Sequence, residues 1–219
     1  MKRMKLKRFL VLVILIIVTL TSFNCFGTDL NNPTNENDYD KIEYVDSYNI
    51  LANYNGEADS IIYNVINQQK NDIRNQIVAE VKRYINNQSP TANKNMSEHL
   101  VIKCLENNLD ICFVMSQTQV ETNFGTIGAG RSTSRRSMFG VAIRKYPSYE
   151  SAINDYIAIL KKSYLVKGRT EQHLMKNYVN GSGCRYASST NYEKHLFEAY
   201  NNIKAQTNIY KLQKHYYSM

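Results

Sequence analysis

The sequence contains no tryptophan, only four histidines and four cysteines, and no motif typical of a metal or nucleotide site. Any aromatic surface must therefore be built from its 17 tyrosines and 7 phenylalanines. Because the histidines are dispersed and no cysteine or histidine pair stands at ligand spacing, we predict neither a metal site nor a cofactor. The glycine-rich run at 125–131 has neither the spacing nor the Lys-Ser/Thr ending of a phosphate-binding loop, so we expect a mobile loop there.

Acidic residues are the scarcer charged type: Asp and Glu number 19 against 27 Lys and Arg, a formal net charge of +8. Residues 1–27 hold five basic and no acidic residues, and residues 97–219 hold sixteen basic and nine acidic ones. A basic domain suits an anionic partner. The chain lacks a glycine-flanked aromatic RNA-binding signature and zinc-finger spacing, so we predict no nucleic-acid partner and favour another anionic polymer.

The N-terminus has the layout of a secretory signal peptide. Residues 1–8 are strongly basic, residues 9–20 are almost entirely apolar, and small or polar residues follow. The small residues Cys25 and Gly27 suit cleavage after Gly27. Alternatively Cys25 carries a lipid, or the segment stays as an anchor, since residues 9–26 are close to the minimum length for a bilayer. All three alternatives place the domain outside the cytoplasm, with membrane contact only through this signal.

The remaining cysteines, Cys104, Cys112 and Cys184, are an odd number, so in an exported chain at least one thiol stays unpaired. Cys104 and Cys112 approach each other if a turn at 107–108 joins two antiparallel helices. Free cysteines are usually buried as small apolar side chains, and this is the outcome that we expect.

Beyond the signal, two segments precede the main domain. Residues 28–56 are rich in Asn and Asp without a sustained apolar period, which predicts an extended or disordered spacer. Residues 57–96 are predicted to form a long amphipathic helix and a short loop, because Ile and Val recur at three- and four-residue steps. This helix either packs on the domain or self-associates as a coiled coil, and the polar gap between Ile66 and Ile73 favours packing.

Residues 97–219 are predicted to fold into a mainly α domain. Ser97, Ser148 and Thr170 are expected to cap helices, and the poorly patterned residues 137–145 predict short strands or an irregular lobe. The expected helices cover residues 97–105, 110–124, 148–163, 170–178 and 192–209.

Glu121 is an acidic side chain on an otherwise apolar helix, which Gly125 is expected to end. It falls within about 20° of Val114 and one turn beyond Gln117 by helical arithmetic. A carboxylate in that position is partly desolvated, which raises its pKa. A protonated carboxylic acid at the lip of a cleft is what a glycosidase uses to protonate a leaving oxygen. The alternative is a helix-end glutamate in solvent or in a salt bridge.

The stretch Glu121-Thr-Asn-Phe-Gly125, with Gln117 four residues earlier, resembles the Q-x-x-x-E-(S/T)-x-(F/W)-G signature of the glucosaminidase family. Three further stretches resemble the family in the expected order, at 137–141, 146–156 and 185–192, and the likeness covers roughly 97–203. The resemblance implies a lysozyme-like helical domain with a small irregular or β lobe. It also implies an endo-β-N-acetylglucosaminidase that cleaves β-1,4 bonds in peptidoglycan, so that the glycan strands of the cell wall become the expected anionic partner.

The resemblance implies that Glu121 is the general acid and that Tyr186 lies near the cleaved bond, where its hydroxyl contacts the substrate or steadies the acid. Tyr186 is alternatively a buried packing residue. Gln117 is placed to tune the protonation of Glu121 by hydrogen bonding, or is a satisfied polar residue of the bundle. Three aromatic side chains are further candidates for lining the sugar groove, each with core packing as the alternative: Phe124, Phe139 and Tyr156.

A second carboxylate is missing from the expected place. Glycosidases usually pair two carboxyl groups, yet residues 122–149 contain no Asp or Glu and five basic residues. The N-acetyl group of the substrate then serves as internal nucleophile, or Glu121 acts alone as in a lytic transglycosylase. A third alternative is a protein that binds wall glycan without turning it over. Glu150 or Asp155, on the next helix, are less favourably placed to supply the missing group.

Overall fold

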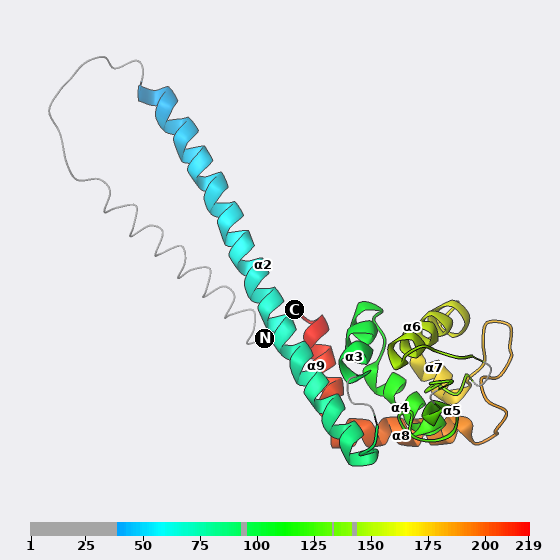
Figure 1. Cartoon of the computed structure of the whole chain (residues 1–219). Coiled ribbons are helices and arrows are strands. Elements are labelled where there is room, and N and C mark those ends of the chain that lie inside the picture. Colours follow the sequence, from blue (N-terminus) through cyan, green and yellow to red (C-terminus); the bar gives the residue numbers. More distant parts are fainter. Residues whose placement is uncertain (1–38, 93–95, 133, 142–143) are drawn as a thin grey trace. The chain divides into compact units, whose positions relative to one another are not determined.

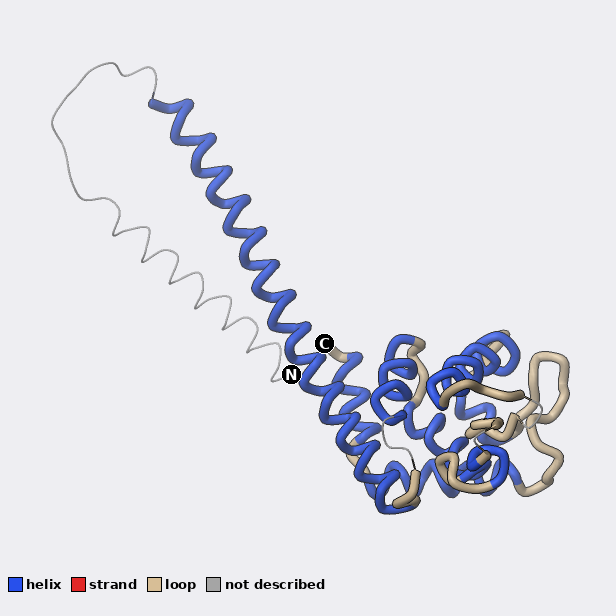
Figure 2. The backbone as a smooth tube through the Cα atoms, in the orientation of Figure 1, coloured by secondary structure: helices blue, strands red, loops and turns tan. Residues whose placement is uncertain are grey.

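A computed structural model describes residues 39–92, 96–132, 134–141 and 144–219, and the chain divides into two units, Met1–Gly56 and Glu57–Met219. The predicted export signal and residues 28–38 lie outside the described residues. The described part is mainly helical, as the sequence predicts, and Figure 2 shows no strand in it. An isolated antiparallel bridge joins Val179 and Arg185. None of the helices described here combines the length and apolarity needed to cross a bilayer.

The first described helix, α2, spans Tyr39–Gln88. The prediction of an extended or disordered spacer is therefore wrong for residues 39–56, which are helical. This stretch contains no proline, and extending a helix that is already nucleated adds one hydrogen bond for each residue fixed. The Asn and Asp content that suggested disorder was thus outweighed by continuity with the amphipathic helix.

The predicted packing of α2 on the domain is confirmed for its C-terminal part. Ile77, Val81 and Ile85 are completely buried in the core. The apolar residues nearer to the start of the second unit, around Ile61 and Val65, are exposed. Packing therefore begins at about Ile73, after the polar gap.

Helix α4, Ile111–Thr122, is the centre of the second unit (Figure 1). Every residue of its first two turns is buried, and it packs chiefly against α8. This confirms the prediction of a helix that is apolar around most of its circumference. The surrounding elements are α3 (Met96–Glu106), α5 (Gly128–Arg131), α6 (Tyr149–Ile159), the π-helical turn η1 (Leu160–Tyr164), α7 (Glu171–Lys176), α8 (Tyr192–Gln206) and α9 (Ile209–Tyr217).

The start of α4 is fixed by Asp110. Its Oδ1 accepts hydrogen bonds from the backbone N–H groups of Cys112 at 2.8 Å and Phe113 at 3.4 Å, and its Oδ2 accepts one from the Tyr200 hydroxyl at 2.8 Å. These bonds satisfy amides that the helix itself leaves unpaired.

We expect Asp110→Ala to lower the free energy of unfolding by about 2 kcal/mol, because it removes the cap and leaves the Tyr200 hydroxyl without its acceptor. Asp110→Asn is the matched control, since an amide oxygen still caps well and should retain most of the stability. Urea denaturation of the two variants measures the difference. Equal midpoints for the alanine and wild-type proteins would contradict the assignment.

Several predicted helix boundaries need correction. Ser97 is not a cap: α3 begins at Met96, and the Ser97 hydroxyl is buried without a hydrogen-bond partner in the described structure. The single helix predicted at 192–209 is broken at Thr207, whose extended backbone separates α8 from α9 and whose Oγ1 accepts from the amide of Ile209 at 3.4 Å. A threonine side chain that bonds its own backbone competes with the helix in this way. Ser148 and Thr170 do cap α6 and α7 as predicted.

The segment between α4 and α6 is irregular in its described part. The glycine-rich run was predicted as a mobile loop, but it contains the one-turn helix α5. Gly130 of α5 packs so closely that an added Cβ would lie 2.7 Å from the Gly125 Cα. Residues Ser137, Met138 and Phe139 are buried, so this lobe is anchored to the core.

Two of the three cysteines after Cys25 are buried as free thiols, as predicted. Cys104 and Cys112 are buried and unpaired, whereas Cys184 is exposed. Burial raises the pKa of both Cys104 and Cys112, which keeps these thiols protonated as small apolar side chains. They are core residues of α3 and α4.

Candidate active site

Glu121 lies in the last turn of α4. The helix ends at Thr122, and Asn123 caps it in the left-handed conformation with φ 46°, its N–H bonding the carbonyls of Thr118 and Gln119. Asn123 rather than the predicted Gly125 therefore ends the helix, because asparagine tolerates a left-handed cap. Gly125, with φ 81°, continues the reversal. The turn carries the chain away from α4 directly after Glu121.

The Glu121 carboxyl group is partly buried against the backbone of the lobe. A Cβ added at Gly140 would lie 1.9 Å from the Glu121 Oε2 and 2.5 Å from its Cδ. Only a glycine leaves room for the carboxyl group in this arrangement. Burial raises the pKa of Glu121, and a hydrogen bond with Tyr192 partly opposes the rise. The prediction of a partly desolvated carboxyl group with a raised pKa is confirmed.

Tyr192 connects Glu121 to Gln117. The Gln117 Nε2 donates to the Tyr192 hydroxyl at 2.5 Å, and Tyr192 in turn lowers the pKa of the Glu121 carboxyl group. Gln117 therefore acts on Glu121 through Tyr192 rather than directly, while its own Oε1 is buried without a partner among the described residues. Sequence reasoning gave Tyr192 no role, although it ends the last of the four family-like stretches.

Two more tyrosines lie close to Glu121. Tyr178 and Tyr186 stack with their ring centroids 4.5 Å apart, and each also contacts the Tyr192 ring, at 6.0 and 5.8 Å. Burial is the main reason that the pKa values of Tyr178 and Tyr186 are raised, and the nearby Glu121 charge adds to both shifts. The Tyr186 hydroxyl donates to the Phe139 carbonyl. The structure thus places Tyr186 near Glu121, as the resemblance implies, and adds two further tyrosines. We call Tyr178, Tyr186 and Tyr192 the tyrosine trio.

Phe124, Phe139 and Tyr156 are core residues, each about 1 % exposed. The Phe139 and Tyr156 rings stack 3.9 Å apart, and Phe124 packs edge-on against Tyr84. The prediction that these three rings line a sugar groove is therefore wrong, because no face of any of them is open to a ligand. Their packing alternative holds, and Phe139 reaches the site only through its backbone carbonyl.

The two carboxylates considered as partners of Glu121 have other contacts. Asp155 pairs with Arg144 at 2.5 Å and accepts from the Tyr146 hydroxyl at 2.6 Å. The pKa of Glu150 is lowered mainly by its own backbone amide at the start of α6. Within the part of the chain that the structure describes, only burial and Tyr192 act on the Glu121 pKa. No group of three or more His, Cys, Asp or Glu side chains in that part is arranged so that it could hold a metal ion.

A cavity of about 520 Å³ begins where α4 ends. It is lined by Thr91, Ala92, Gly125, Thr126, Arg131 and Tyr149. Glu121 is not among these residues, so the assignment of Glu121 depends on its own surroundings and not on this cavity.

We expect Tyr192→Phe to raise the pKa of Glu121, because the lost hydroxyl donates to the ionised carboxylate and favours it. A ¹³C NMR titration of the protein labelled at glutamate carboxyl groups measures this, with the signal assigned by its disappearance in Glu121→Gln. Tyr210→Phe is the control, since Tyr210 lies on α9 and its ring packs against Lys204 and Lys214. An unchanged or lowered pKa in Tyr192→Phe would show that the hydrogen bond does not form.

Comparison with known proteins returned no match: no family model, curated protein or solved structure is significantly similar to the chain. The glucosaminidase-like stretches therefore remain a resemblance in short motifs. What the site does has to be inferred from its geometry.

Proposed function

We propose that this protein is an exported peptidoglycan hydrolase of the endo-β-N-acetylglucosaminidase type, with Glu121 as its general acid. The observation that carries the proposal is the environment of Glu121. This carboxyl group is partly buried and has a raised pKa, and its hydrogen-bond partner is a tyrosine rather than a cation. A carboxyl group with a raised pKa at the end of a buried helix is suited to protonating a glycosidic oxygen. The four motif stretches support the choice of sugar and a lysozyme-like fold for the helical domain.

Among the described residues no second carboxylate acts on the Glu121 pKa. In the mechanism that we favour, the substrate itself therefore supplies the nucleophile. The carbonyl oxygen of the N-acetyl group attacks the anomeric carbon while Glu121 gives its proton to the departing oxygen. Water then opens the cyclic intermediate and returns a proton to the ionised Glu121. The acid is thus regenerated at the end of each cycle.

Two alternative functions use the site differently. In a lytic transglycosylase Glu121 first protonates the leaving oxygen and then, as a base, takes the proton of the sugar hydroxyl that closes the anhydro ring. In a glycan-binding protein the five cations of residues 122–149 attract the wall polymer, and no bond is cleaved. Arg131, Arg135 and Lys145 are exposed members of this set.

The products distinguish the three functions. The full chain is incubated with purified peptidoglycan, and the released fragments are examined by mass spectrometry. Reducing N-acetylglucosamine ends are expected, and anhydro ends would establish the transglycosylase instead. Co-sedimentation with the wall in the absence of any new ends would reject both enzymes and leave the binding protein.

A further inference from the structure

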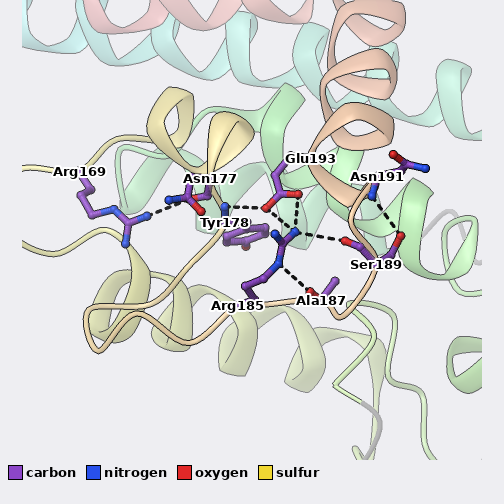
Figure 3. Close-up of polar contacts among 8 residues, drawn as sticks. All are labelled: Arg169, Asn177, Tyr178, Arg185, Ala187, Ser189, Asn191 and Glu193. Carbon is purple, nitrogen blue, oxygen red and sulfur yellow. Dashed lines mark hydrogen bonds and ion pairs between the residues drawn. The ribbon is translucent and has the colours of Figure 1, made fainter.

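Arg185 closes the loop between α7 and α8. Its NH2 group donates to Glu193 Oε1 at 2.9 Å and Oε2 at 2.7 Å, on the first turn of α8 (Figure 3). The same side chain donates to the carbonyls of Ala187 and Ser189, both at 3.2 Å. One guanidinium group therefore fixes the loop to itself and to the helix that follows it.

Glu193 binds the other arm of the loop. Its Oε1 also accepts the backbone N–H of Tyr178 at 3.0 Å. The Glu193 side chain is only 13 % exposed, against 43 % for Arg185. Burial on its own would raise the pKa of Glu193, but the hydrogen bonds from backbone amides and from Arg185 outweigh it and lower the pKa. The carboxylate is therefore ionised at neutral pH and available to both partners.

The pair is adjacent to every member of the tyrosine trio. Glu193 bonds the amide of Tyr178, Arg185 directly precedes Tyr186, and Glu193 directly follows Tyr192. The backbone bond from the Tyr186 amide to the Tyr178 carbonyl, at 2.8 Å, holds the two arms of the loop in register. The ion pair thus adjoins the backbone of all three tyrosines, while the Arg169 guanidinium group holds the same loop separately, through the carbonyls of Asn177, Val179 and Asn180.

We propose that Arg185 and Glu193 are positioning residues, which hold the half-buried Tyr186 against the buried Tyr178 and beside Glu121, and thereby limit how much water reaches the proposed acid. A partly exposed ion pair contributes little to the stability of the whole fold, so its loss frees the loop without unfolding the domain. Tyr178 and Tyr192 stay in place, because both are buried and the Tyr178 hydroxyl is hydrogen-bonded to that of Tyr156 at 3.1 Å. Tyr186, which is only half-buried, is the ring that is freed. The charged and titratable groups that face Glu121 from the described elements are then the three tyrosines, with Gln117 and Gly140 completing its surroundings.

The test is Arg185→Gln in the full-length protein, with the Glu121 pKa measured by ¹³C NMR. Because water reaches the carboxyl group once the rings separate, the pKa is expected to fall towards that of an ordinary glutamate, opposite in sign to the Tyr192→Phe shift. Each unit of decrease lowers the protonated fraction tenfold at pH values above the pKa. If Glu121 is the acid, kcat at neutral pH falls by the same factor and recovers at lower pH, with KM unchanged.

Arg83→Gln is a closely matched control. Arg83 pairs with Glu80 at 2.8 Å and bonds the Gln206 carbonyl, while Glu80 also accepts the amide of Asn208 at 3.1 Å. This second ion pair repeats the chemistry of the first on another part of the domain. We expect its loss to leave the Glu121 pKa and the pH profile of kcat unchanged.

A Glu121 pKa that is the same in Arg185→Gln and wild type would overturn the proposal, as would an equal shift in Arg83→Gln. Glu193→Gln is the second variant: it keeps an acceptor for the Tyr178 amide but loses the charge, so a smaller fall in the Glu121 pKa is expected. If Arg185→Gln does not fold, an unchanged Glu121 pKa in Glu193→Gln would likewise overturn the proposal.

The inference depends on the proposed function only for its kinetic readout. If the wild-type protein releases no glycan, the NMR titration still tests the positioning role.

Discussion

Replacing Glu121 by glutamine is expected to slow glycan release by about 10²–10⁴-fold, the usual contribution of a positioned general acid. Glutamine has nearly the same shape but carries no acidic proton, so substrate binding should persist while cleavage stops. The variant should be at least as stable at neutral pH, because the raised pKa of Glu121 means that the fold disfavours the ionised carboxylate. Initial rates of reducing-end release, together with thermal unfolding, measure both quantities.

Glu150→Gln and Asp155→Asn are the comparison variants for this experiment. Both remove a carboxylate from α6 that has contacts elsewhere, so each is expected to leave the rate within a few-fold of wild type. A loss in either as large as in Glu121→Gln would establish a mechanism with two carboxylates. Wild-type rates in Glu121→Gln itself would remove the proposed acid.

Gly140→Ala is expected to be almost as damaging as the loss of the proposed acid, with a decrease in rate of about 10²-fold or more. Its new methyl group would lie 1.9 Å from the Glu121 Oε2, so either the carboxyl group or the lobe backbone has to move. Gly140 also has φ 71°, in the left-handed region that alanine adopts only at a cost of about 1–2 kcal/mol. The rate and the unfolding free energy must therefore be measured together.

Gly128→Ala and Gly168→Ala separate these two effects. Both positions have positive φ, 55° and 75°, and an added Cβ at either meets nothing within 4 Å. They should show the backbone cost alone and retain wild-type rates. If Gly140→Ala behaves like them, the contact with Glu121 has no catalytic consequence.

The central part of the site was predictable because it is local. The helical spacing of apolar residues over 110–124 predicts that Glu121 has apolar neighbours on α4. Those neighbours in turn predict a raised pKa for Glu121. Gly140 and Tyr192 come from elements that pack against α4 only in the folded chain. No periodicity within either segment indicates that contact, so the sequence pattern could not assign them.

Aromatic residues gave the wrong predictions for a related reason. A phenylalanine or tyrosine suits a sugar surface and a core equally well, and only burial decides between them. Phe124, Phe139 and Tyr156 are core residues, whereas Tyr186 lies near Glu121. The early start of α2 is not indicated by composition, because it depends on the continuity of the helix with the amphipathic residues that follow.

The exposed thiol of Cys184 gives direct experimental access to the loop that carries Tyr186. Among the described cysteines it alone is accessible, since Cys104 and Cys112 are completely buried with raised pKa values. A maleimide spin label or fluorophore would therefore attach next to Arg185 in the native protein and not within the core. Its mobility would report whether the loop is closed, without any substrate and independently of turnover.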